Sequence, residues 1–85
     1  MIHQITSKYG TERWRLAPDG NAEFNFGTEK EPVIASVPAG FSELVVQGRM
    51  CGDFYAELTG PSGCGSAIGE TPHQAFVALV EQVSA

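Results

Sequence analysis

The stretch ETPHQAFVALVEQVS, residues 70–84, carries the clearest structural signal in the chain. Thr71 and Gln74 have the spacing of a capping box, in which the Thr71 hydroxyl accepts from the Gln74 N–H and the Gln74 side chain reaches back to the Thr71 N–H. Pro72 fits the first helical position, where its missing N–H costs nothing. These features predict a helix that begins at Pro72.

The residues after this cap repeat at helical spacing. Positions i, i+3, i+4 and i+7 of the segment are all apolar: Phe76, Leu79, Val80 and Val83. Such a stripe is typical of a helix that packs one face on a sheet. His73 lies one turn before the stripe, where the favoured interpretation is a packed or capping histidine rather than a catalytic one.

Upstream of the helix, two segments alternate apolar and polar side chains, which is the pattern of half-buried strands. They are residues 13–16 and 22–26, and they flank Pro-Asp-Gly-Asn at 18–21, a sequence with strong turn chemistry. A hairpin closed over this turn forms two cross-strand pairs: Trp14 with Phe24, and Arg15 with Glu23.

Four more strands are predicted, at residues 2–9, 33–37, 43–50 and 54–59. The third and fourth form a second hairpin, while the second is an edge strand because prolines bound it. Strands followed by one terminal helix predict a single α+β domain over residues 1–85. Its expected core is an antiparallel sheet of about five strands with the helix across one face.

The charges are unevenly distributed. The net charge is −5, yet residues 1–30 hold four acids and four bases, whereas residues 31–85 hold six acids and one base, Arg49. An acidic field of this kind repels phosphate backbones, so direct nucleic-acid binding is not expected, and it steers the chain toward a basic surface. The plain alternative is that mild negative charge only keeps a small protein in solution.

The segment Gly60-Pro61-Ser62-Gly63-Cys64-Gly65 has the glycine spacing of a phosphate-binding loop. A phosphate site needs Lys and then Ser or Thr after the glycines, but Ser66 and Ala67 stand there. A helix should also begin at once, so that its N–H groups meet the phosphate. We therefore expect a flexible glycine loop or a loop used in partner recognition, and no nucleotide cofactor.

Other site chemistry is sparse in this sequence. Cys51 and Cys64, together with two scattered histidines, do not form a zinc signature, and free thiols are expected. A Cys64–His73 dyad, or a triad of Ser62 or Ser66 with His73 and an acid, stays open as a small-enzyme alternative. No run of 18 apolar residues and no export signal is present, so the expectation is a cytoplasmic chain without a membrane span.

The segment from Phe54 onward resembles the HicB-like antitoxin family. The family shows a strand, a Pro-Gly-Cys turn, a small polar residue, a Gly-acid-Thr step and a helix rich in Glu and Ala. The residues that carry the likeness are Tyr55-Ala56-Glu57-Leu58, Pro61-Ser62-Gly63-Cys64, Ser66, Gly69-Glu70-Thr71, Ala75 and Ala78. This resemblance implies a sheet-plus-helix domain that masks a small RNA-cleaving toxin.

By size, acidity and lack of an enzyme signature, the chain is also similar to phage-borne inhibitors such as anti-CRISPR proteins. The leading prediction is a non-enzymatic inhibitor that blocks a basic, nucleic-acid-handling protein. The expected contact residues are five acids and one aromatic anchor: Glu29, Glu31, Asp53, Glu57, Glu70 and Tyr55. The runner-up is a self-associating module that pairs through the predicted edge strand at residues 33–37.

Overall fold

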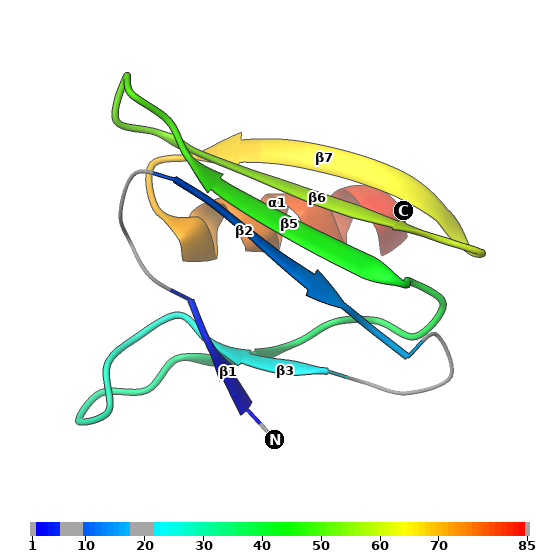
Figure 1. The fold of residues 1–85 in the computed structure, drawn as a ribbon, viewed down its shortest axis with the longest axis horizontal. Helices are drawn as coiled ribbons and strands as arrows, with labels where there is room; N and C mark the ends of the chain where they lie inside the picture. The colour runs from blue at the N-terminus through cyan, green and yellow to red at the C-terminus, as the bar shows by residue number, and fades with distance from the viewer. Residues whose placement is uncertain (1, 6–9, 18–21, 85) are drawn as a thin grey trace.

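The computed structural model describes residues 2–5, 10–17 and 22–84. These residues form seven strands, arranged in two sheets, and one helix. Figure 1 shows how the sheets and the helix are arranged. The elements are β1 (Ile2–Gln4), β2 (Gly10–Arg15), β3 (Glu23–Asn25), β4 (Ile34–Ser36), β5 (Glu43–Gly48), β6 (Phe54–Gly60), β7 (Gly63–Gly69) and α1 (Pro72–Ser84). The α+β class is confirmed, but the strands are divided between two sheets rather than united in one.

The larger sheet is antiparallel with the order β2-β5-β6-β7, and the smaller one has the order β1-β3-β4. Helix α1 packs along β6 and β7, behind the larger sheet in the view of Figure 1, and the smaller sheet lies beside the β2 edge. Ring contacts join the smaller sheet and its flanking residue Phe26 to β2 and α1. Trp14 meets Phe24 edge-on with 5.1 Å between ring centroids, and Phe26 lies 5.0 Å from Phe76 of α1.

The core lies between one face of the larger sheet, helix α1 and the smaller sheet. Leu44 of β5 lies opposite Leu58 of β6, and both side chains are completely buried. Leu79 of α1 and Phe24 of β3 are buried to the same degree, so each layer contributes at least one large side chain. The predicted apolar stripe of the helix is confirmed, since all four of its residues belong to this core or pack against it.

The first predicted hairpin is wrong in its strand pairing. β2 pairs with β5, and β3 pairs with β4 and in parallel with β1. Trp14 and Phe24 do touch, but as members of different sheets rather than as cross-strand neighbours. Arg15 lies opposite Glu43, not Glu23. The turn sequence at 18–21 lies outside the described residues.

The second predicted hairpin is confirmed as the pair β5–β6, with Gly48 opposite Phe54. The first predicted strand is confirmed at Ile2–Gln4, and residues 6–9 lie outside the described part of the chain. The predicted edge strand is confirmed as β4, the last strand of the smaller sheet.

The predicted glycine loop is wrong. Residues 61 and 62 make a tight turn, and Gly63–Gly69 is a full strand that pairs with β6 along its whole length. Two glycines of this strand pack closely against the helix. A side chain at Gly69 would lie 2.5 Å from the backbone nitrogen of Ala75, and one at Gly65 would meet the side chain of Val83 at 2.6 Å. The helix therefore rests directly on the backbone of β7.

The helix begins as predicted, with one difference in its cap. The Gln74 N–H donates to the Thr71 hydroxyl at 3.1 Å, but the Gln74 side chain accepts from the Glu70 N–H at 3.2 Å instead of bonding to Thr71. The cap thus satisfies a backbone donor one residue earlier than the capping box predicts, because the chain turns sharply between β7 and α1.

Replacing Thr71 by alanine should lower the free energy of unfolding by about 1 kcal/mol, because the Gln74 N–H loses its acceptor. Thermal denaturation followed by circular dichroism measures this loss. Thr71→Ser keeps the hydroxyl and should retain most of the stability. Equal losses in both variants would show that the hydroxyl does not cap the helix.

Candidate functional site

The face of the larger sheet that points away from α1 has no layer packed on it among the described elements, and it faces the viewer in Figure 1. We call it the open face. Strand alternation and the pairing register place on it one residue of every two from each strand. They are Thr11, Arg13, Arg15, Glu43, Val45, Gln47, Tyr55, Glu57, Thr59, Cys64, Ser66 and Ile68.

One part of the open face combines apolar and acidic residues. Tyr55 of β6 lies directly opposite Ile68 of β7, and Ile68 is 53% exposed although it is a large apolar residue. Glu57 follows Tyr55 on the same face. Asp53 and Glu70 flank the Phe54–Gly69 pair at the end of the same two strands. We call these five residues the β6–β7 patch.

Hydrogen bonds order the polar groups of this patch. The Tyr55 hydroxyl donates to Oε2 of Glu57 at 3.0 Å, which holds both half-buried side chains against the sheet. Asp53 is bonded within its own turn, with its Oδ1 3.0 Å from Nε of Arg49 and 3.2 Å from Sγ of Cys51. Asp53 is thus partly neutralised, and Glu57 and Glu70 supply most of the patch's negative charge.

Two predicted contact residues are not part of this patch. Glu29 and Glu31 lie in the loop between β3 and β4, beyond the smaller sheet, and are exposed there. This loop is fixed through Asn25, whose Oδ1 accepts from the N–H groups of Gly27 and Val33 at 2.9 and 3.0 Å. Four of the six predicted residues therefore come together, and two belong to a different surface.

The open face also carries basic residues, on its β2 edge. Arg13 and Arg15 lie there, and Arg13 Nη1 is 3.6 Å from Oε1 of Glu43. This pair is exposed and contributes at most about 1 kcal/mol. The predicted acidic face is therefore divided, with positive charge along β2 and negative charge along β6 and β7.

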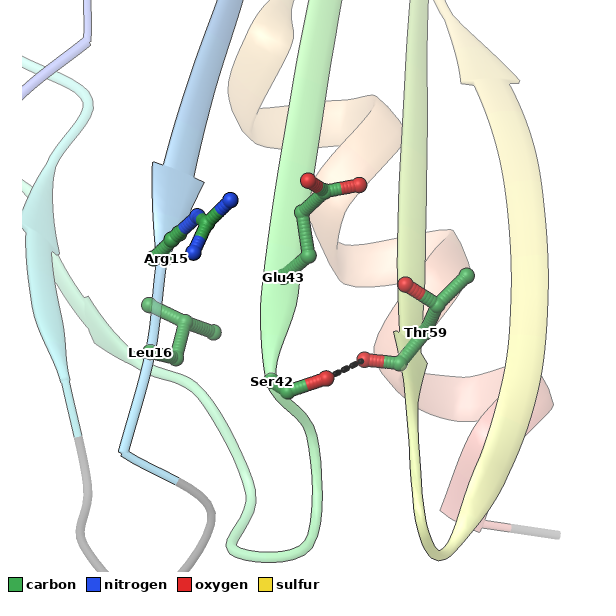
Figure 2. Close-up of a pocket in the computed structure, with 5 residues that line it drawn as sticks. All are labelled: Arg15, Leu16, Ser42, Glu43 and Thr59. Atoms are coloured by element: carbon green, nitrogen blue, oxygen red, sulfur yellow. Dashed lines mark hydrogen bonds between the residues drawn. The ribbon is translucent and has the colours of Figure 1, made fainter.

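A shallow depression lies where β2, β5 and β6 reach the same end of the sheet, as Figure 2 shows. Its volume is about 410 Å³, and it is lined by Arg15, Leu16, Ser42, Glu43 and Thr59. The Ser42 hydroxyl donates to the Thr59 carbonyl at 3.3 Å, and no histidine or cysteine lines the depression. Its lining therefore offers charged and polar contacts for a bound molecule.

The residues of the small-enzyme alternative do not meet. Cys64 lies on the open face beside the turn at residues 61–62, because it pairs with Thr59. His73 lies in the helix layer, near the opposite end of β7, with its ring 5.6 Å from that of Phe26. Ser66 shares the open face with Cys64 and is separated from His73 by the sheet. Cys51 and Cys64 are both free and exposed, at opposite ends of β6.

Two further findings concern the described part of the chain. No group of three or more His, Cys, Asp or Glu residues within it is arranged to hold a metal ion. Helix α1 is neither long nor apolar enough to cross a membrane.

Sequence reasoning missed one member of the β6–β7 patch, Ile68. The residues that alternate with it toward the helix are Gly65, Ala67 and Gly69, which are too small to give a visible apolar pattern. The signal that was available is the segment from Gly63 to Glu70, which contains one large apolar side chain, Ile68, two residues before an acid.

Searches for related proteins give no further identification. No family model, no curated protein and no solved structure matches this chain.

Proposed function

We propose that the chain is a non-enzymatic inhibitor that docks its β6–β7 patch on a basic, nucleic-acid-handling protein. The observation that carries this proposal is the pairing of half-buried Tyr55 with exposed Ile68, with carboxylates on the borders of the pair. An aromatic and an aliphatic side chain side by side are suited to be the desolvated centre of an interface. The surrounding acids favour a partner that presents Lys and Arg.

The proposed mode of action is occupation of a nucleic-acid site. A protein that binds nucleic acid presents Lys and Arg side chains to the phosphates. Glu57 and Glu70 can take the place of such phosphates. The Tyr55–Glu57 hydrogen bond supports this role, since it fixes one carboxylate before binding and so reduces the conformational entropy lost on docking.

Two likenesses suggest what kind of protein this partner is. The resemblance of residues 54–80 to HicB-like antitoxins suggests a small RNA-cleaving toxin. The similarity by type to phage inhibitors suggests a nucleic-acid-binding defence complex. Both kinds of partner handle nucleic acid, so either would bind the β6–β7 patch through the Lys and Arg side chains that contact phosphates.

The test compares two double charge reversals in a pull-down from the organism that encodes the chain. Glu57→Lys with Glu70→Lys should reduce capture of the partner at least about tenfold, because two attractive charges become repulsive. Glu29→Lys with Glu31→Lys changes the net charge equally and should leave capture nearly intact. Raising the salt concentration, or adding the partner's nucleic acid, should release the captured protein.

Three outcomes would contradict the proposal. Equal losses in both double variants would mean that overall charge, not the β6–β7 patch, attracts the partner. Capture that persists in the presence of the partner's nucleic acid would exclude a shared site. If Tyr55→Ala binds the partner as well as Tyr55→Phe does, the aromatic ring of Tyr55 is not an anchor of the interface.

A further inference from the structure

A second surface lies in the layer that holds α1 and the smaller sheet. A groove of about 250 Å³ runs between β4 and α1 and is lined by Ala35, Ser36, Phe76, Val77, Val80 and Glu81. Val77 is 42% exposed in this groove, and Ile34 of the neighbouring strand is 44% exposed. Apolar side chains that stay exposed around a groove are typical of a binding surface.

The strand that borders this groove has an unused edge. The Phe26 N–H donates to the Val33 carbonyl, and the Val37 N–H donates to the Ala22 carbonyl, each at 2.9 Å. Bonded and non-bonded pairs alternate between antiparallel strands, so the residues between, Ile34 and Ser36, turn their N–H and C=O groups away from β3. Within the described residues no strand pairs with this side of β4.

We propose that the groove binds an extended peptide of a partner protein, which adds as a strand to β4. Its backbone would bond to the outward groups of Ile34 and Ser36. Its alternate apolar side chains would lie over Val77 and Val80, and a Lys or Arg would meet Glu81. Backbone bonds supply affinity in this mode of recognition, and the pockets for alternate side chains supply specificity.

The charge of the groove favours a basic peptide over a second copy of the chain as its occupant. Glu81 is the only Asp, Glu, Lys or Arg within α1, and β4 contributes no charge, so the groove is negative at one end. A second copy of the chain would bring the loop next to its own β4, residues 29–32, which reads Glu-Lys-Glu-Pro and has a net charge of −1. A peptide that carries Lys or Arg complements Glu81, whereas a second copy does not.

The groove is also independent of the β6–β7 patch. Helix α1 covers one face of the larger sheet, and the groove lies between α1 and β4, whereas the patch lies on the open face of that sheet. Variants can therefore remove either surface alone, and failure of one proposal leaves the other intact.

Selection of phage-displayed random peptides against the full chain tests this proposal. We expect an enriched family that alternates apolar residues and contains Lys or Arg. A synthetic peptide from that family should shift the amide NMR signals of β4 and α1. Glu81→Lys should weaken its binding about tenfold or more through charge reversal. Glu70→Lys, a reversal in the β6–β7 patch, should leave its affinity unchanged.

Ser36→Pro provides an independent test of strand addition. It removes an outward N–H, and proline is tolerated on a strand edge whose N–H faces solvent. A folded Ser36→Pro variant, as judged by its NMR spectrum, should therefore lose the peptide. The proposal fails if no family is enriched, if the shifts fall on the open face, or if Glu81→Lys binds equally well. It also fails if raising the chain's own concentration shifts the same amides, since that identifies a second copy as the occupant.

Discussion

Replacing Gly69 by alanine is expected to lower the free energy of unfolding by about 3 kcal/mol. The added Cβ would lie 2.5 Å from the backbone nitrogen of Ala75 and 2.8 Å from the carbonyl carbon of Gln74. Both are backbone atoms in the first turn of α1, so the whole start of the helix must move away from β7. Urea denaturation measures the loss, and the melting temperature should fall by roughly 15 °C.

Gly65→Ala is the matched control, because Gly65 lies on the same strand and the same face. Its Cβ would meet only side chains, the Cγ1 of Val83 at 2.6 Å and the Oε1 of Gln82 at 2.8 Å. The Val83 end can rotate, and Gln82 can move at the cost of the hydrogen bond that its Oε1 accepts from the Ser66 N–H at 2.8 Å. Alanine also reduces the entropy of the unfolded chain, so the net loss should be about 1 kcal/mol, well below that at Gly69. Equal losses at both positions would refute close backbone packing as the reason for Gly69.

The glycines of β6 and β7 explain why the sequence of residues 60–65 predicts a loop where the structure has two strands and a turn. Gly60 lies against the backbone of Phe41, Gly63 has a φ of +134°, and Gly69 lies against the first turn of the helix. Each glycine meets a different steric requirement, and that of Gly60 involves a segment about twenty residues away in the sequence. Glycine spacing alone does not distinguish glycines that are needed for close packing or a positive φ from those of a phosphate-binding loop.

The local elements could be predicted more fully than their pairing. Alternation located the strands around Trp14 and Phe24, and the apolar stripe located the helix. However, β2 pairs with β5, and β3 pairs in parallel with β1. The turn chemistry between two adjacent strands predicts a hairpin, but burial of Trp14 against Phe24 is achieved equally well between two layers. Local pattern does not distinguish these arrangements.

The residues of the β6–β7 patch that lie on or next to a single strand, β6, could be predicted from the sequence. Tyr55 and Glu57 share a face by simple alternation, and Asp53 stands immediately before the same strand. Glu70 joins them only because β7 returns beside β6, which the sequence did not indicate. Glu29 was predicted by charge alone, and charge says nothing about which loop lies near which face.

Replacing Asn25 by alanine should also cost about 3 kcal/mol, because this buried amide makes four hydrogen bonds. Its Oδ1 accepts from Gly27 and Val33, and its Nδ2 donates to Oε1 of Gln4 and to the carbonyl of Thr28. Alanine leaves these groups without partners. Hydrogen exchange should accelerate at the Gly27 and Val33 amides, while the Val37 amide, bonded to the Ala22 carbonyl, stays protected.

Thr28→Val is the control, since it removes a hydrogen bond from the same loop at an exposed position. The Thr28 hydroxyl accepts from the Glu31 N–H at 3.0 Å, and its loss should cost under about 1 kcal/mol. Because Asn25 fixes Val33 beside β4, Asn25→Ala should also weaken peptide binding in the β4–α1 groove. It should leave the β6–β7 patch unchanged, since that patch belongs to the other sheet. Uniform loss of protection in both sheets would instead show that Asn25 stabilises the whole fold rather than this loop.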